Sequence, residues 1–245
     1  MTGTNLALEV RNIRAGYDSY DVLHGMSLHV GANERVGLFG PNGHGKTTLL
    51  NAISKLIKPT SGSVTFMGAP LDQVSARGIV ERGLIHVPQA NRLFPDMEIM
   101  ETLELAAFTK RARADRKANL DYVLTLFPRL AERRRQQSKT LSGGERQMLS
   151  IGVGIMCAPQ MLMLDEPTLG LSPKLKEELA NAIAGIAKTR SVPMLIVEQD
   201  IAFVLSLVDR MYFVDHGEIA REIDRRSEVD HQEIMDMYFG EQAAS

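Results

Sequence analysis

The chain has 245 residues, of which 44% are hydrophobic and 24% are charged, and its formal charge is −2. This length and composition suit one large domain, or a domain with a sizeable insertion, with a substantial apolar core. No global basic field is present that would draw the chain to nucleic acid or to an anionic membrane. The single cysteine, Cys157, excludes an intramolecular disulfide and a cysteine-rich zinc site, and we expect it to be a small buried side chain in a reducing compartment.

No run of 18 or more apolar residues occurs, so we expect no membrane-spanning helix. Residues 1–9 lack the basic start and the long apolar stretch of a signal peptide. Alternating patterns predict strands over residues 6–10 and 22–30, with Tyr17 in a loop between them.

Residues 40–48 fit the P-loop pattern G-x-x-x-x-G-K-[ST]. A short buried strand is predicted before them, over residues 35–39, and an apolar helical face predicts a helix after them that ends near Lys58. Strand, glycine-rich loop and helix N-terminus together surround phosphate oxygens with backbone N–H groups. We therefore expect this loop to bind ATP through Gly40, Pro41, Asn42, Gly43, His44, Gly45, Lys46, Thr47 and Thr48.

Within this loop, Lys46 can reach the β- and γ-phosphates, and the Thr47 hydroxyl can ligate Mg²⁺. His44 fills a position whose side chain points out of the loop, so we expect no direct chemistry from it. Further strands are predicted over residues 63–67 and 83–87, followed by Pro88 and Gln89. Residues 90–158 then read as a mostly helical segment, whose basic runs 111–117 and 133–135 we interpret as solvated helix faces rather than a nucleic-acid patch.

Inside that segment, Ser142, Gly143 and Gly144 open a predicted helix. Bare glycine amides and a hydroxyl at a helix N-terminus form an anion site, although an ordinary N-cap with a flexible start would have the same residues. The same helix carries Gly152 and Gly154, which lower helix propensity, and we expect close helix packing to be the reason.

Residues 161–166 are four apolar residues followed by Asp165 and Glu166. A buried strand that ends in aspartate brings that carboxylate to the rim where Mg²⁺ binds, and the adjacent Glu166 can polarise a water for attack on the γ-phosphate. A helix is predicted to start at residues 172–173, with a strand over 194–197, a helix over 201–208, a strand over 211–214 and an amphipathic helix over 228–240.

Gly40–Thr47, Leu141–Gln147 and Met161–Glu166, in this order and at this spacing, resemble the nucleotide-binding subunit of ABC transporters over nearly the whole chain. The resemblance implies an α/β fold: a P-loop NTPase with a RecA-like core, an antiparallel β portion and an inserted α-helical subdomain. We expect the core to comprise residues 1–89 and 159–227, the helical subdomain 90–158, and a C-terminal helix or tail 228–245.

The resemblance also implies a head-to-tail dimer. Ser142 and Gly144 of one subunit would contact the γ-phosphate held by the P-loop of the other, and residues 168–173 would cross the interface. Tyr17 matches an aromatic that stacks on adenine, and Gln89 matches the glutamine that senses Mg²⁺ and the attacking water. Gln199 stands where most of these ATPases carry a switch histidine. Because an amide cannot carry positive charge, we hypothesise that this site hydrolyses ATP more slowly than its partner site.

A narrower resemblance, to the LivF-type subunit of branched-chain amino acid importers, rests on residues 87–89, 93–95, 126–130, 165–173 and 197–200. It implies a second ATPase of the LivG type (or a homodimer), two membrane-spanning permease subunits and, as an indirect partner, a periplasmic substrate-binding protein. It also implies a peripheral location on the cytoplasmic face of the inner membrane. Urea or amide importers use similar subunits. A soluble ABC ATPase of DNA repair or translation is the alternative from another class, but this chain lacks zinc cysteines, a coiled-coil arm and a second cassette.

Overall fold

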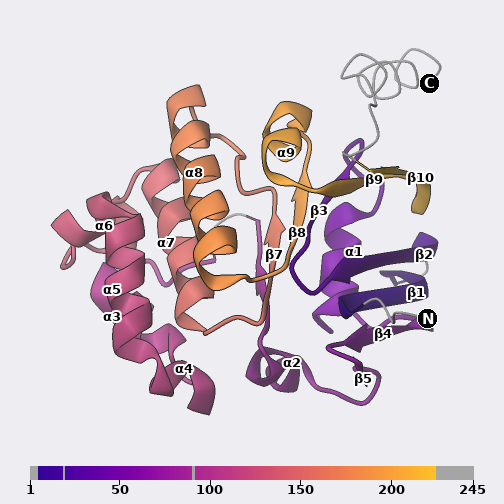
Figure 1. The fold of residues 1–245 in the computed structure, drawn as a ribbon, viewed down its shortest axis with the longest axis horizontal. Helices are drawn as coiled ribbons and strands as arrows, with labels where there is room; N and C mark the ends of the chain where they lie inside the picture. The colour runs from indigo at the N-terminus through magenta and orange to yellow at the C-terminus, as the bar shows by residue number, and fades with distance from the viewer. Residues whose placement is uncertain (1–4, 19, 90–91, 225–245) are drawn as a thin grey trace. The chain divides into compact units, whose positions relative to one another are not determined.

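The computed structural model describes residues 5–18, 20–89 and 92–224, and the chain divides into two compact units (Figure 1). The first, the β-rich unit, comprises residues 1–72 and 195–245, and the second, the helix-rich unit, comprises residues 73–194. Within the described residues, no helix is long and apolar enough to cross a membrane. The amphipathic helix predicted over residues 228–240 lies outside the described ranges, and the predicted domain boundaries stay a prediction.

An antiparallel sheet forms one side of the β-rich unit, as predicted. Its strands are ordered β2-β1-β4-β5 and span Leu6–Tyr17 (β1), Tyr20–Gly31 (β2), Ser61–Phe66 (β4) and Ala69–Pro70 (β5). The first strand is longer than expected, because its pairing with β2 continues from Leu6 to Tyr17 through several register shifts. The prediction that Tyr17 lies in a loop is therefore wrong, since it is the last residue of β1.

The other strands of this unit position the P-loop. They are β3 (Arg35–Phe39), β8 (Met194–Glu198, whose first residue belongs to the helix-rich unit), β9 (Arg210–Asp215) and β10 (Glu218–Asp224), in the order β10-β9-β3-β8. Strand β3 runs parallel to β9, and helix α9 (Ile201–Leu207) packs on β3. At Gly37 a Cβ atom would lie 2.5 Å from Val204 Cγ1, so the missing side chain allows this close approach.

Helix α1 (Lys46–Ile53) is shorter than predicted. It ends at Ile53, and Lys55 adopts a left-handed conformation with φ of 58°, which stops the helix before Lys58. Leu56, expected on the buried face, is 57% exposed. The apolar periodicity of the sequence continued past the residue at which the backbone changed direction.

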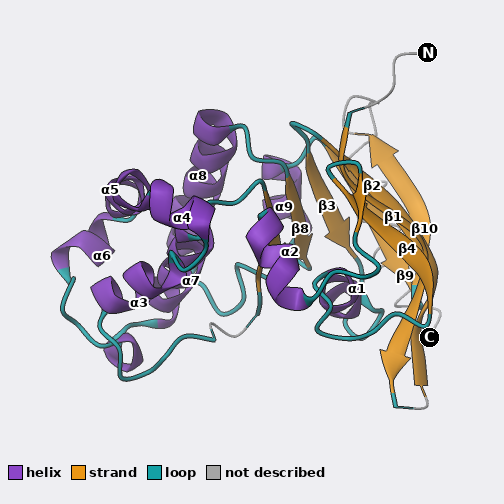
Figure 2. Ribbon diagram, turned by 90° about the horizontal axis from the view of Figure 1, so that it is seen from below, coloured by secondary structure: helices purple, strands orange, loops and turns teal. Residues whose placement is uncertain are grey.

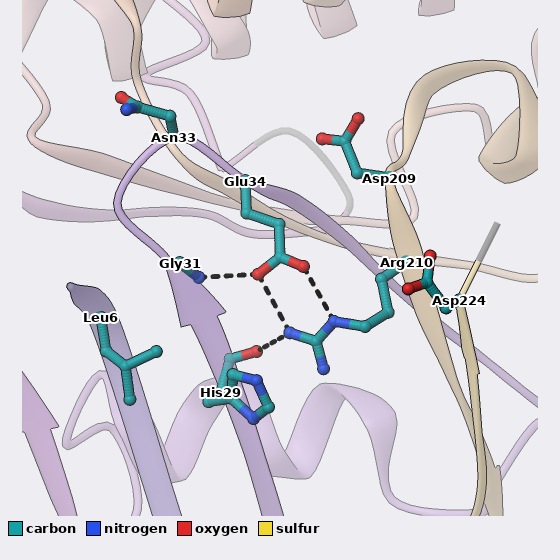
Figure 3. A pocket seen from close by; sticks show the side chains of 8 residues that line it. All are labelled: Leu6, His29, Gly31, Asn33, Glu34, Asp209, Arg210 and Asp224. Atoms are coloured by element: carbon teal, nitrogen blue, oxygen red, sulfur yellow. Dashed lines mark hydrogen bonds and ion pairs between the residues drawn. The ribbon is translucent and has the colours of Figure 1, made fainter. Parts of the chain in front are cut away.

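A buried arginine joins the strands of the β-rich unit at the end away from the P-loop (Figure 3). Arg210 donates to both carboxylate oxygens of Glu34, at 2.8 and 3.0 Å, and to the carbonyl oxygen of His29 at 2.8 Å. Burial raises the pKa of Glu34, but the hydrogen bonds from Arg210 and the Gly31 amide and the arginine charge outweigh it and hold the pKa below its usual value. This network lines a pocket of about 420 Å³ and ties β9 to β2 and β3.

The helix-rich unit has a parallel strand pair, β6 (Leu84–Val87) and β7 (Met161–Asp165), and all five residues of β7 are buried, as predicted for a covered strand. Helices fill most of the segment predicted to be helical, and two helices lie outside it. The helices of this unit are Ala76–Arg82 (α2), Ile99–Ala106 (α3), Lys110–Ala114 (α4), Arg116–Leu126 (α5), Pro128–Glu132 (α6), Gly143–Met156 (α7) and Pro173–Arg190 (α8). Helix α7 contacts α3, α5 and α6 (Figure 2).

Cys157 lies at the end of α7 and is buried, as expected. Its thiol donates to the carbonyl oxygen of Ala106 at 3.6 Å, and burial raises its pKa to about 11. The thiol is therefore protonated at neutral pH and acts as a small packing group.

Gly152 and Gly154 of α7 face packed side chains, which confirms the expected close packing. A Cβ atom at Gly154 would lie 2.7 Å from Val87 Cγ2 and 3.4 Å from Leu162 Cδ2, and one at Gly152 would lie 3.0 Å from Val123 Cγ1. The helix thus approaches β6 and β7 at a distance that only glycine permits.

We predict that Gly154→Ala lowers the free energy of unfolding by about 1–3 kcal/mol, because overpacking against Val87 outweighs the gain in helix propensity. Gly185→Ala, at a half-buried position of α8, is the matched control. Its Cβ atom meets only Leu126 Cδ1 at 3.8 Å, so it should raise stability by up to about 1 kcal/mol. Urea denaturation of both variants checks this, and a Gly154→Ala protein as stable as the control would contradict the packing argument.

Candidate functional site

The P-loop follows β3 and contains three glycines with positive φ. Gly40, Gly43 and Gly45 have φ of 152°, 83° and 99°. A Cβ atom at Gly40 would lie 2.2 Å from the carbonyl oxygen of Val214, and one at Gly45 would lie 2.8 Å from Leu23 Cδ2. These positive φ values and close contacts explain why glycine occupies the fixed positions of the motif.

Lys46 begins α1 and is only 4% exposed. Its ammonium group donates to the carbonyl oxygens of Gly40 and Pro41, at 2.7 and 2.8 Å. The lysine charge is therefore held against the loop, next to the amide groups at the start of α1. A fixed ammonium group and a helix N-terminus together provide an electrostatic environment suited to a triphosphate.

Two further predicted residues lie in the same unit. Tyr17 is 46% exposed, and its hydroxyl oxygen accepts a hydrogen bond from Asn51 Nδ2 of α1 at 3.2 Å. Gln199 follows β8, the neighbour of β3, and its backbone N–H donates to Oε2 of the buried Glu198 at 3.1 Å. The ring of Tyr17 thus stands beside the P-loop helix, while its stacking on adenine and the role of Gln199 stay predictions.

In the helix-rich unit, Gln89 and Glu166 contact each other directly. The strands β6 and β7 pair in parallel with Val87 opposite Leu164, so the residues two positions further on meet at the same edge of the sheet. Gln89 Nε2 donates to Glu166 Oε2 at 2.9 Å. The motifs had assigned the two residues separately, and the strand register is the signal that would have paired them.

Glu166 is 8% exposed and has a φ of 45°, in the left-handed region. This conformation costs a residue with a Cβ atom about 1–3 kcal/mol and is concentrated at functional positions. Together with the bond from Gln89, the backbone geometry fixes the direction of the carboxylate. A fixed carboxylate is what a general base requires.

The residues predicted to hold Mg²⁺ all offer oxygen donors, which is the donor type that this ion prefers. Asp165, at the end of β7, is 2% exposed, and Thr47 offers a hydroxyl. Because the amide nitrogen of Gln89 faces Glu166, the oxygen of the same amide is the atom available as a ligand. The donor set therefore fits Mg²⁺.

Ser142 and Gly143 are exposed at the start of α7, whereas Gly144 is buried. Ser142 is the N-cap: its Oγ accepts from the Glu145 amide at 3.3 Å, and Glu145 Oε2 accepts from the Ser142 amide at 2.9 Å. Burial raises the pKa of Glu145, but the hydrogen bonds of Ser142 and the charge of Arg133 outweigh it and lower the pKa. Ser142 is thus the N-cap that the simpler alternative expected, and its role toward an anion stays a prediction.

The two signature glycines differ in their surroundings. A Cβ atom at Gly144 would lie 2.6 Å from Leu175 Cδ1, whereas nothing lies within 4 Å of the corresponding position at Gly143. In the loop at residues 168–173, Thr168 is buried, but Leu169 is 60% exposed and Gly170 has a φ of 73° with no atom near its Cβ position. Both segments offer accessible surface, as their predicted role at an interface requires.

One contact was missed by sequence reasoning. His44, expected to have no chemistry, lies against the β9–β10 turn, with Nδ1 2.9 Å from Asp215 Oδ1. The two residues are far apart in sequence, and no motif links them.

Comparison with known proteins places these features in a family. The model of the ABC transporter family matches residues 23–169. The branched-chain amino acid transport ATP-binding protein BraG of Pseudomonas aeruginosa is 34% identical over 91% of this chain and 95% of its own length. A probable LivF protein of Archaeoglobus fulgidus is 30% identical over 95% of this chain and 98% of its own length.

Solved structures show the same fold. A dimeric ATP-binding cassette bound to ADP and phosphate superposes with a TM-score of 0.80 at 23% identity, over 89% of this chain and 98% of the cassette. The predicted α/β fold of a P-loop ATPase is confirmed. With a family model that spans more than half of the chain and relatives similar along nearly all of it, this protein belongs to the ABC transporter family and is an ATPase of that family.

Proposed function

We propose that this chain is the ATP-hydrolysing subunit of an importer for branched-chain amino acids. The observation that carries the proposal is the combination of a preformed P-loop around Lys46 with similarity to BraG and LivF along more than nine-tenths of the chain. The exposed residues 142–143 and 169–170 support a subunit that works in a pair.

ATP binding is assigned to the loop that follows β3. Backbone amides of residues 40–48 cradle the phosphates, the Lys46 ammonium neutralises charge on the β- and γ-phosphates, and Tyr17 stacks on adenine. Thr47, Gln89 and Asp165 would hold Mg²⁺, which when bound neutralises developing charge on the phosphates.

Hydrolysis is assigned to Glu166. Its carboxylate accepts a proton from the attacking water, and the bond from Gln89 Nε2 keeps the carboxylate oriented. Because Glu166 is nearly buried, water competes weakly for its oxygens. Gln89 thus acts both as a metal ligand and as a positioning residue for the base.

Each P-loop would be completed by another subunit. Ser142 and Gly144 of a LivG-type partner, or of a second copy of this chain, contribute amide and hydroxyl donors to the γ-phosphate, and this chain provides the same residues in return. Two membrane-spanning permease subunits would hold the pair at the cytoplasmic face of the inner membrane. A periplasmic substrate-binding protein would be an indirect partner on the opposite side of the membrane.

Co-purification from native membranes tests the transporter assignment. A tagged chain should recover membrane-spanning proteins together with a second ATPase, and reconstituted vesicles should take up labelled leucine, isoleucine or valine when ATP is present. Recovery of ribosomes or DNA would instead indicate a soluble ABC ATPase, and uptake of urea or amides alone would correct the cargo.

We predict that Lys46→Ala weakens ATP binding about tenfold to a hundredfold, because a charged donor to phosphate contributes roughly 1.5–3 kcal/mol. Calorimetric titration with ATP measures this. Lys58→Ala, at an exposed position in the same unit, is the control and should bind ATP normally. Equal affinity in the two variants would refute the role of Lys46.

Glu166→Gln should preserve ATP binding and lower the hydrolysis rate of the assembled transporter by about 10²–10⁴-fold, the usual loss for a missing general base. The amide has the shape of the carboxylate and can still accept from Gln89 through its oxygen. Steady-state phosphate release measures the effect, with Glu177→Gln on the exposed surface of α8 as the control. Full ATPase activity of the Glu166→Gln variant would show that Glu166 is not the general base.

The glutamine at position 199 leads to a prediction that the two ATP sites of the assembled pair differ in hydrolysis rate. Gln199→His should raise the ATPase rate of the assembled transporter about three- to tenfold, because a charge-assisted bond to the γ-phosphate is about twice as strong as a neutral one. Single-turnover assays on the assembled pair measure this. The hypothesis of a slower site would be wrong if Gln199→His left the ATPase rate unchanged while the equivalent substitution in the partner subunit changed it.

A further inference from the structure

A cluster of two histidines and one aspartate joins the P-loop to the turn between β9 and β10. His44 Nδ1 lies 2.9 Å from Asp215 Oδ1, and His216 Nδ1 lies 2.7 Å from the same oxygen. The two imidazole rings are tilted against each other with centroids 4.5 Å apart. The three potential ligand atoms all lie within 4.8 Å of one another.

The backbone holds these three side chains in place. His216 and Gly217 adopt left-handed conformations, with φ of 41° and 79°, which form the tight turn after β9. The Gly217 amide donates to the carbonyl oxygen of His44 at 3.2 Å, and the His24 amide donates to the carbonyl oxygen of Gly217 at 2.8 Å. A Cβ atom at Gly217 would lie 2.1 Å from the carbonyl oxygen of Val22, so the turn is seated firmly on β2. The backbone of the turn is therefore held in place beside His44.

Two contacts of His44 Nδ1 place opposite demands on that nitrogen. It accepts from the His216 amide at 3.1 Å, which requires a lone pair on the nitrogen. It also lies 2.9 Å from Asp215 Oδ1, an approach that requires a proton or a cation between the two atoms. Because an imidazole nitrogen has one in-plane lone pair, a cation bound by Nδ1 and Oδ1 would replace the His216 amide proton at Nδ1.

The cluster is open to solvent. The side chains of His44, Asp215 and His216 are 21%, 29% and 82% exposed, so an ion can reach the cluster from solvent and keep water ligands.

We propose that His44, Asp215 and His216 form a binding site for a divalent transition-metal ion such as Zn²⁺. Two imidazole nitrogens and one carboxylate oxygen are a common donor set for zinc, with further positions open to water. Ligands about 2.0–2.1 Å from such an ion are separated from each other by roughly 2.8–3.4 Å, close to the 2.7 and 2.9 Å spacings of this cluster. Mg²⁺ prefers oxygen ligands and is a poor competitor here.

A bound ion would connect the P-loop at residue 44 to the end of β9. The site is separate from the oxygen ligands assigned to the Mg²⁺ that accompanies ATP. It makes the conformation of this P-loop responsive to transition-metal concentration.

Calorimetric titration of the full-length chain with Zn²⁺, in excess Mg²⁺ and without nucleotide, tests the proposal, since ATP would itself chelate zinc. We expect one site per chain. Asp215→Asn and His216→Asn should each weaken binding at least about tenfold, the loss that follows removal of even a supporting group at a metal site. Asparagine at position 216 suits the left-handed backbone, so this variant retains the turn.

His29→Gln is the matched control, because His29 lies in the same unit, outside the cluster, and should leave zinc affinity unchanged. Substitution of Co²⁺ provides a second readout: visible absorption bands of nitrogen and oxygen coordination should appear in the wild type and disappear in His44→Ala. Equal zinc affinity in the wild type and His216→Asn, or loss of binding in His29→Gln alone, would overturn the site and leave a hydrogen-bonded turn.

Discussion

The structure depends on one backbone constraint, the sharp turn by which β3 becomes a loop whose amide groups point inward. Three glycines with positive φ make the turn, and Gly40 passes so close to the Val214 carbonyl that a side chain is excluded. The turn then lets the first residue of α1, Lys46, bond back to Gly40 and Pro41. The glycine-rich loop, the helix N-terminus and the position of the lysine charge therefore share one origin.

Much of the β-rich unit supports this turn. Strand β9 lies beside β3 and provides Val214, while Arg210 anchors the other end of β9 to Glu34 and His29. Gly37 lets α9 approach β3 closely. In the helix-rich unit, the in-register pairing of β6 and β7 plays the corresponding part, because it brings Gln89 to Glu166.

The sequence predicted what is encoded locally. The P-loop, the buried strand ending at Asp165 and the N-cap at Ser142 depend on neighbouring residues, and each appears where its motif placed it. The errors arose where distant contacts or single backbone conformations decide the structure. Pairing with β2 extends β1 to Tyr17, and the left-handed Lys55 helps to end α1 at Ile53 despite continued apolar periodicity. The contact of His44 with Asp215 depends on strand order, which no local pattern reports.

The central claim of this account is that the chain holds half of each catalytic site, so ATP should join two subunits. Multi-angle light scattering of the Glu166→Gln chain, alone and mixed with a LivG-type subunit, measures this most directly. The account predicts that the mass doubles in at least one of these samples when MgATP is added and returns to that of single subunits when nucleotide is removed. Single subunits in both samples at saturating MgATP would contradict it.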